Sequence, residues 1–330
     1  MQVARVAGVL VARAGALEQE RGDVQAHVVG ADHRDALVEL EEGAAGVEQA
    51  VEDALDLVGE RVLELGLAEQ ARSYYNDASA LFAVLFGLPG FFEPRTPPAW
   101  IYPAMPSQSL SFYDTTPLRQ TLLDLVDFDM INSKRIRFSV GAVNLRSGNF
   151  DYFDNAKQTI GPEHIMASSA LPPGFPPVEI DGEFYWDGGF LGNPAIFPLI
   201  YNCDSRDVVI VHINPIQRAE VPKTAVEIMN RINEISFNSS LMREMRAISF
   251  VTKLIDGGQL DDKQFRLMRV HGIAADDVMC GLGVASKLNA DWDFLTELRD
   301  VGRERAQAWL DAKFGDVGKN STVDIAATYL

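Results

Sequence analysis

The amino-acid usage of this chain changes abruptly near residue 72, and the change limits where a packed core can begin. Residues 1–70 contain only Ala, Val, Leu, Gly, Glu, Asp, Arg, Gln, His and Met. The 18 Phe, 4 Trp, 8 Tyr, 16 Pro and 2 Cys all follow this stretch. Independent draws at one frequency would leave 70 positions without these five types with a probability on the order of 10⁻⁶. We therefore expect the folded part of the chain to begin near Tyr74.

Three interpretations of the first 72 residues stay open. Residues 1–70 hold 15 Asp and Glu against 5 Arg, which gives −10 of the chain's net charge of −18. The segment could be a low-complexity helical extension, the product of a shifted reading frame in GC-rich DNA, or an authentic domain. A helix is plausible because one apolar stripe recurs at spacings of three and four, formed by Val47, Val51, Leu55, Val58, Val62 and Leu65.

Charge and cysteine content exclude several classes of protein. A sequence pI near 4.7 argues against nucleic acid as a partner, because phosphate binding requires a basic surface. No stretch approaches the roughly 20 apolar residues of a spanning helix, so we expect no transmembrane segment. Cys203 and Cys280 lack metal-ligand spacing and are too few for a disulfide scaffold. We expect a cytoplasmic protein.

Strand patterns alternate with helix patterns after residue 74, which predicts an α/β fold with helices covering a sheet. Residues 207–213 (DVVIVHI) form a nearly continuous apolar run, typical of a parallel strand buried on both faces. The Asp181-Gly182 pair between two apolar runs predicts a hairpin. Further predicted strands cover 135–144, 150–153, 178–180 and 183–186, and predicted helices cover 118–126, 162–170, 194–201, 222–256 and 291–314.

Residues 82–92 (FAVLFGLPGFF) are apolar and aromatic but only about half as long as a spanning helix. Proline at 94, 97 and 98 closes the run. We expect a buried helix followed by a loop, with contact to a membrane as the alternative.

The most informative stretch is residues 167–199, which contains Asp187-Gly188-Gly189 after a predicted strand. An Asp-Gly-Gly tripeptide alone is common, but its flanks make it specific. The flanking residues are Ala167-Ser168-Ser169-Ala170, Pro172, Phe175-Pro176, Tyr185-Trp186 and Asn193-Pro194. Together they resemble the second motif of the patatin-like phospholipases.

The resemblance runs from about residue 74 to the end of the chain and is similar to a bacterial branch with an extra C-terminal region. It implies a patatin-like sheet flanked by helices. On this basis we divide the chain into an atypical segment at 1–72, the C-terminal half of a patatin-like domain at 73–215, and a mostly helical region at 216–330.

The same resemblance implies a lipid acyl hydrolase that uses a Ser-Asp pair, no cofactor and no metal. Asp187 would accept the proton of a serine hydroxyl, and Gly188 and Gly189 would let the backbone turn close to that serine. The implied partner is a lipid ester or a membrane surface, so a cytoplasmic protein of this kind could lie at the membrane periphery.

The nucleophile that Asp187 would serve is not found. This family carries it in a G-x-S-x-G turn, and no serine of the chain has glycine at both −2 and +2. Gly8, Gly15, Gly22 and Gly30 are isolated and form no oxyanion loop. We therefore expect an incomplete sheet and an unknown nucleophile. The chain would be either an inactive hydrolase or a noncatalytic remnant that binds a lipid or a partner.

Other candidates for chemistry are weaker. Ser168 and Ser169 are small residues that suit close packing near the motif, and Ser107, Ser109 and Ser111 lie in a polar loop. His164, His212 and His271 show no metal-ligand spacing, and a lone histidine such as His212 at the end of a strand is more often structural. Asp261-Asp262 suggests a helix start and Asp276-Asp277 a loop or cap. Asp187 itself could be only a turn residue.

Overall fold

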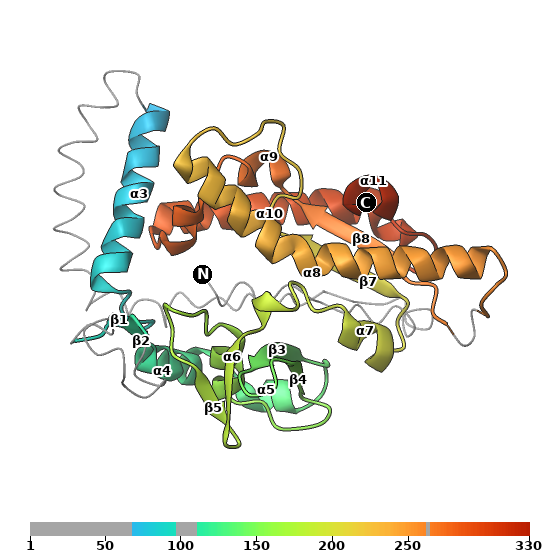
Figure 1. Ribbon diagram of the computed structural model, residues 1–330, viewed down its shortest axis with the longest axis horizontal. Helices are drawn as coiled ribbons and strands as arrows, with labels where there is room; N and C mark the ends of the chain where they lie inside the picture. The colour runs from blue at the N-terminus through green and yellow to red at the C-terminus, as the bar shows by residue number, and fades with distance from the viewer. Residues whose placement is uncertain (1–67, 97–110, 262–264) are drawn as a thin grey trace.

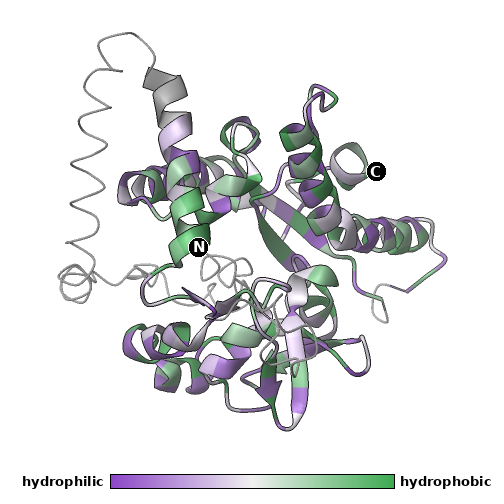
Figure 2. Ribbon diagram, turned by 60° about the vertical axis from the view of Figure 1, so that its left-hand side comes forward, coloured by the Kyte–Doolittle hydropathy of each residue, from purple (hydrophilic) through white to green (hydrophobic). Residues whose placement is uncertain are grey.

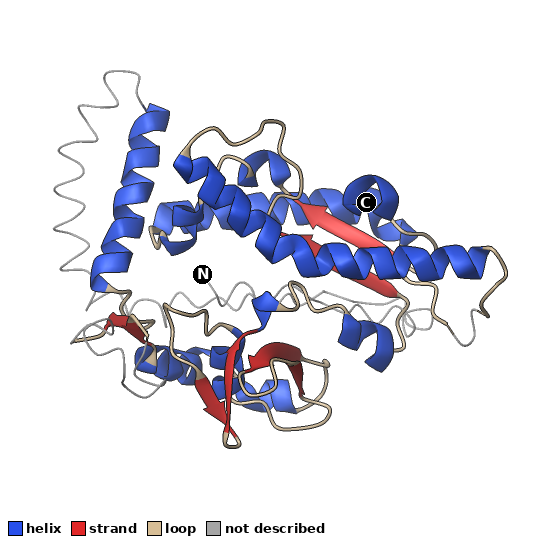
Figure 3. Cartoon of the chain, viewed as in Figure 1, coloured by secondary structure: helices blue, strands red, loops and turns tan. Residues whose placement is uncertain are grey.

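The computed structural model describes residues 68–96, 111–261 and 265–330 and shows a mixed α/β fold (Figures 1 and 3). This confirms the predicted fold class. The apolar stripe predicted over residues 47–65 lies outside the described residues. One group of elements contains a four-stranded antiparallel sheet, and a second contains two parallel strands with the long C-terminal helices.

The four-stranded sheet has the order β4-β3-β6-β5. Its strands are β3 (Ser139–Asn144), β4 (Phe150–Asp154), β5 (Val178–Ile180) and β6 (Glu183–Asp187). The β5–β6 hairpin turns at Asp181 and Gly182, whose φ angles are 52° and 80°. Such angles favour Asp and Gly, which confirms the predicted hairpin. Strand β3 begins at Ser139 rather than at residue 135, because the Phe138 N–H and the Ile136 carbonyl bond the Asn155 side chain instead of a neighbouring strand.

Helices cover one side of this sheet. Helix α6 (Pro162–Ser168) packs against it around Ala142, Phe153, Ile160, Ala167 and Tyr185. The helix ends two residues before the predicted position 170, in a tight turn where the Ser169 N–H donates to the Met166 carbonyl. Helices α4 (Thr116–Leu125) and α5 (Phe128–Asn132) lie beside it, and Leu118 and Leu122 of α4 bury their side chains against Ile165.

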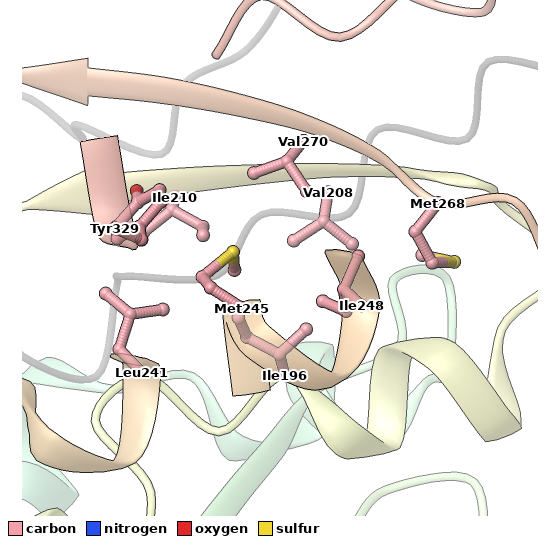
Figure 4. Close-up of a cluster of buried hydrophobic side chains, with 9 residues drawn as sticks. All are labelled: Ile196, Val208, Ile210, Leu241, Met245, Ile248, Met268, Val270 and Tyr329. Carbon is pink, nitrogen blue, oxygen red and sulfur yellow. The ribbon is translucent and has the colours of Figure 1, made fainter. Parts of the chain in front are cut away.

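The second sheet pairs β7 (Asp207–His212) with β8 (Arg269–Ala274) in parallel register. One face packs on helices α7 (Phe197–Asn202), α8 (Ala225–Asp256) and α11 (Ile325–Tyr329) through the cluster in Figure 4. Val208 and Ile210 point into this cluster. The prediction that the whole 207–213 run is buried is wrong at its end, because Val211 is 45% exposed.

The predicted C-terminal helices are confirmed with small shifts at their ends. Helix α8 begins in a reciprocal cap in which Thr224 accepts from the Glu227 N–H and Glu227 accepts from the Thr224 N–H. Helix α10 (Trp292–Lys313) is capped by Asp291. The short elements α9 (Asp276–Met279) and η4 (Val284–Leu288) lie between β8 and α10, and η5 (Phe314–Asp316) follows α10. Helix α7 starts later than residue 194, because the Asn193 N–H donates to Ser240 Oγ and holds a loop.

The interpretation of residues 82–92 as a buried helix is partly wrong. Helix α3 (Ala68–Phe86) ends at Phe86 and a loop follows, as predicted. However, Leu81 is 57% and Phe86 is 64% exposed, and only small residues such as Ala83 are buried on the packed face. The lower end of α3 is accordingly coloured as hydrophobic in Figure 2. Past this helix, β1 (Glu93–Pro94) pairs with β2 (Tyr113–Asp114).

The C-terminal segment covers the outer edge of β8. The Thr322 and Val323 N–H groups donate to the Val270 carbonyl, and the Val270 N–H donates to Ser321 Oγ. Backbone groups that are satisfied in this way are not free to pair with another chain at that position. Residues 321–323 therefore act as a short cover for the sheet.

The buried carboxylate of Asp207 links the C-terminal segment to both strands. Asp207 of β7 accepts from Arg269 at 2.8 Å and 2.9 Å, from His271 Nε2 at 3.0 Å and from the Gly318 N–H at 2.9 Å. Burial alone would raise the pKa of Asp207, but these hydrogen bonds outweigh it and hold the pKa well below its usual range.

Removal of the Asp207 charge should destabilise the fold because it leaves Arg269 without its buried partner. We expect Asp207→Asn to lower the free energy of unfolding by about 2 to 4 kcal/mol. Asp300, which pairs with Arg299 on the surface, provides the matched control. Asp300→Asn should leave the free energy of unfolding essentially unchanged in the same denaturant titration, because exposed ion pairs are screened by water and salt. Equal effects of the two variants would contradict this role for Asp207.

A second carboxyl group, that of Glu244 on α8, lies near Ile196 and Tyr152. Burial raises the pKa of Glu244 from its ordinary 4.5 to about 7, although a hydrogen bond from the Ile196 backbone opposes the rise. Its Oε2 is buried and has no hydrogen-bond partner in the described part of the chain. Burial, together with the nearby Glu244 charge, also raises the pKa of Tyr152 to about 12.

Glu244 should make stability fall as the pH rises. A carboxyl whose pKa is raised in the folded state contributes fully below its unfolded pKa near 4.5, and the contribution is lost as the pH rises through 7. After allowance for partial solvent screening, we expect a loss of about 1 to 2 kcal/mol between pH 5 and 8. Glu244→Gln should remove this difference in urea titrations, whereas the exposed Glu304→Gln should retain it.

Candidate active site

The predicted base Asp187 lies at the end of β6, opposite Ala142 of β3. Its side chain is almost completely buried, with 3% exposed. Its N–H donates to the Ala170 carbonyl at 2.9 Å, and its Oδ1 accepts from the Gly189 N–H at 2.7 Å. This second hydrogen bond is the cap of the short helix η3 (Gly188–Phe190). Strand, cap and backbone together hold Asp187 in one position.

The glycines after Asp187 are required by close approach. A Cβ atom added to Gly188 would lie 2.2 Å from the Gly141 carbonyl oxygen of β3, a distance that no side chain can occupy. A Cβ on Gly189 would lie 3.0 Å from Asp187 Oδ1 and 3.2 Å from the Phe237 ring. Gly188 therefore allows β3 and the turn after β6 to touch through their backbones.

A cavity of about 690 Å³ opens beside Asp187. Its wall combines β3, the turn after β6, the carboxyl ends of β7 and β8, helix α8 and helix α10. The lining is mostly apolar and includes Val140, Phe150, Leu199, Ile213, Ile273, Met279, Leu282, Leu295 and Leu298. Cavities of this size and composition bind small apolar molecules in many proteins.

Serines near the motif divide into two groups. Ser168 and Ser169 both line the cavity, as their proximity to the motif in the sequence suggested. Ser169 Oγ donates to the Ile165 carbonyl at 3.1 Å, which is a helix-terminal role. The sequence placed Ser111 in a polar loop. Its Oγ donates to the Tyr113 carbonyl and accepts from Arg95, so its role is structural. Ser107 and Ser109 lie outside the described residues.

The three histidines have different surroundings. His164 Nδ1 accepts from the Gly161 N–H, and the fully buried His271 binds Asp207, so both are structural. His212 lines the cavity. Its Nδ1 lies 3.1 Å from the Asn214 carbonyl, which makes Nδ1 the protonated nitrogen. Its Nε2 is buried and has no partner among the residues that the structure describes. Burial lowers the pKa of His212 and favours the neutral ring.

Two polar groups of the wall could not be found by sequence reasoning. Glu234 of α8 binds both Arg218 and Arg231, and it faces the cavity although it is nearly buried. Arg305 of α10 pairs with Asp277 and also lines the cavity. In the sequence, only the i,i+3 spacing of Arg231 and Glu234 indicated that these two residues could pair on one helix face. Their approach to Asp187 depends on the packing of the C-terminal helices.

No group of three or more His, Cys, Asp and Glu side chains within the described ranges is arranged to hold a metal ion. No helix within them has the length and apolar character to cross a membrane. Asp276 lies in the first turn of α9, where a loop or cap was predicted. Asp262 lies outside the described residues.

Comparison with known families identifies part of the chain. Residues 69–200 match the family model described as patatin-like phospholipase. This segment carries a patatin-like phospholipase domain. The match spans Asp187, confirms the family resemblance for this segment and relates the segment to lipid acyl hydrolases. Residues 201–330 lie beyond the match, so the resemblance there stays a prediction. No curated protein matches the chain.

The close backbone contact at Gly188 generates a stability prediction for the patatin-like domain. We expect Gly188→Ala to lower the free energy of unfolding by about 2 kcal/mol or more, because the β3 backbone must move away. Gly302→Ala is the control, since a Cβ there meets no atom within 4 Å. It should leave stability unchanged or raise it slightly. A Gly188→Ala variant with unchanged thermal unfolding would contradict the contact.

Proposed function

We propose that this chain carries the carboxylate half of a patatin-like lipid acyl hydrolase and does not itself hydrolyse esters. The observation that supports the first part is Asp187, which is buried at the wall of a large apolar cavity and oriented by the Gly189 N–H. A carboxylate in a fixed position away from bulk water is suited to accept a proton from a nucleophile.

The second part of the proposal follows from the chemistry of the pair. A serine hydroxyl becomes a useful nucleophile only when a base takes its proton, and a base without such a hydroxyl achieves no acyl transfer. The chain contains no serine with glycine at both −2 and +2. Ser169, next to the motif, uses its hydroxyl to bond the Ile165 carbonyl. We therefore assign Asp187 as the base and leave the nucleophile unassigned.

The apolar cavity suits the acyl chain of a lipid ester, which supports a lipid as the bound molecule. We also propose the division at residues 72 and 215, in which the first segment would lie outside the hydrolase fold. A location in the cytoplasm, at the periphery of a membrane, is part of the same proposal.

A second candidate function is a noncatalytic contact with a lipid surface or a protein partner. The specific observation is the apolar side of α3, where Leu81, Leu85 and Phe86 are each more than half exposed. Exposed apolar groups of this kind often mark interaction surfaces. This function does not require Asp187.

The purified chain should show no reaction with a serine-directed fluorophosphonate probe and no hydrolysis of short-chain nitrophenyl esters. The reason is the missing hydroxyl, so Asp187→Asn should leave both signals at the level of the wild type. Probe incorporation can be measured by intact-protein mass spectrometry.

The contrary result is equally clear. Stoichiometric labelling, or ester turnover that Asp187→Asn abolishes, would show that another hydroxyl serves this carboxylate. Ser168→Ala and Ser169→Ala would then identify it, since both residues line the cavity.

A further inference from the structure

Helix α8 presents a continuous side of exposed residues along most of its length. Leu241, Met245 and Ile248 on its inner side pack against the β7–β8 pair, which the helix crosses in Figure 1. Side chains on the opposite side recur at helical spacing and are exposed. We call the eight large residues of this side the outer face of α8. They are five apolar residues, each between 45% and 64% exposed, and three cations: Ile228, Met229, Ile232, Ile235 and Phe250, with Arg243, Arg246 and Lys253.

The outer face carries positive charge in a strongly acidic chain. The chain has 47 Asp and Glu against 29 Lys and Arg, yet no acidic residue belongs to this face. Glu227 caps the first turn, Glu234 and Glu244 lie on the inner side, and Asp256 ends the helix. The three cations of the face form no ion pair with another residue that the structure describes. An acidic group from outside can therefore pair with them without displacing an existing partner.

Apolar and charged side chains of this face are separated along the axis of the helix. Four apolar residues lie between positions 228 and 235, and the cations lie between 243 and 253. At 1.5 Å per residue, the face from position 228 to 253 is about 38 Å long. A helix that lies in a membrane surface instead separates apolar and charged residues around its axis, so that one whole side can insert. The outer face therefore fits an elongated partner with two different halves better than a uniform bilayer.

A second copy of the same face would be a poor match. Antiparallel pairing would bring the apolar half of one helix against the charged half of the other. Parallel pairing would place Arg243, Arg246 and Lys253 opposite their own copies, and like charges at a contact disfavour association. The complementary acidic charge must come from a different surface.

The helix dipole indicates the orientation of a helical partner. Acidic side chains stabilise a helix most when they lie near its N-terminus. A partner helix with acids in its N-terminal half and apolar residues in its C-terminal half matches both halves of the outer face when it runs antiparallel to α8.

We propose that the outer face of α8 is the docking site for an acidic amphipathic helix of a partner protein. The helix binds antiparallel to α8, with its acidic N-terminal half against Arg243 and Arg246 and its apolar C-terminal half against Ile232 and Ile235. This interaction uses neither Asp187 nor the cavity, so it stands independently of the proposed hydrolase site.

Binding can be measured by fluorescence anisotropy with the full-length chain and a labelled peptide of about 26 residues, the length of the face. This acid-first peptide carries Glu on one side of its N-terminal half, Leu on the same side of its C-terminal half, and Ala elsewhere to favour a helix. A second peptide of the same composition has the halves exchanged. We expect the acid-first peptide to bind about 5-fold more tightly, and added salt to weaken its binding. Equal affinities would overturn the proposed orientation.

A double variant tests the charged half. Arg243→Glu with Arg246→Glu should weaken binding of the acid-first peptide by about 10-fold or more, because two attractions become repulsions. Arg119 and Arg135 are exposed residues outside α8, so Arg119→Glu with Arg135→Glu makes the same change in net charge. This control should bind within about 2-fold of the wild type at physiological salt.

A second double variant tests the apolar half. Ile232→Ser with Ile235→Ser should also weaken binding by about 10-fold, because the contact loses its apolar centre. Leu123 and Ile136 are exposed apolar residues elsewhere, so Leu123→Ser with Ile136→Ser is the matched control and should bind like the wild type. All four variants change exposed side chains, and their thermal unfolding by circular dichroism should match that of the wild type.

Several results would overturn the proposal. One is binding that the outer-face variants leave unchanged, or that the controls weaken equally. Another is a chain that ignores the peptide but sediments with phosphatidylglycerol vesicles through Arg243 and Arg246, which would make the face a membrane contact. A dimer in sedimentation velocity that Ile232→Ser with Ile235→Ser dissociates would show that a second copy occupies the face.

Discussion

The site depends on one close contact between two backbones. Gly188 lies so near Gly141 that a single added carbon would sit 2.2 Å from a carbonyl oxygen. This contact brings the turn after β6 against β3 and places Asp187 opposite Ala142. The Gly189 N–H then orients the carboxylate. The motif Asp187-Gly188-Gly189 is therefore a structural unit before it has any chemical role, because its glycines determine where the carboxylate can be.

Both parts of the fold contribute to the wall of the cavity beside Asp187. Its wall takes residues from the patatin-like segment and from β7, β8, α8 and α10, which lie beyond the matched range. The buried cluster at Asp207 stabilises this second part by joining β7, β8 and the C-terminal segment. The shape of the cavity consequently depends on residues as far along the chain as Arg305, although the family relationship rests on the segment that contains Asp187.

Patterns of neighbouring residues correctly predicted those helices, strands and turns that depend on neighbouring residues alone. The Asp181-Gly182 hairpin, helices α8 and α10 and the parallel strand β7 all follow from neighbouring residues. Burial was harder to predict. Apolar residues near Phe86 are exposed, and Val211 at the end of β7 is exposed too. A hydrophobic run reports what a segment can bury, whereas its actual burial depends on which other elements reach it.

The sequence by itself determined the family of residues 69–200, the aspartate motif and the order of most helices and strands. These properties depend on spacing along the chain, on turn chemistry and on which residues can approach without a side chain. Only the tertiary structure decided that His212, Glu234 and Arg305 share one cavity wall with Asp187. They come from separate elements, and their proximity results from the packing of α8, α10 and the β7–β8 pair, which no local pattern encodes.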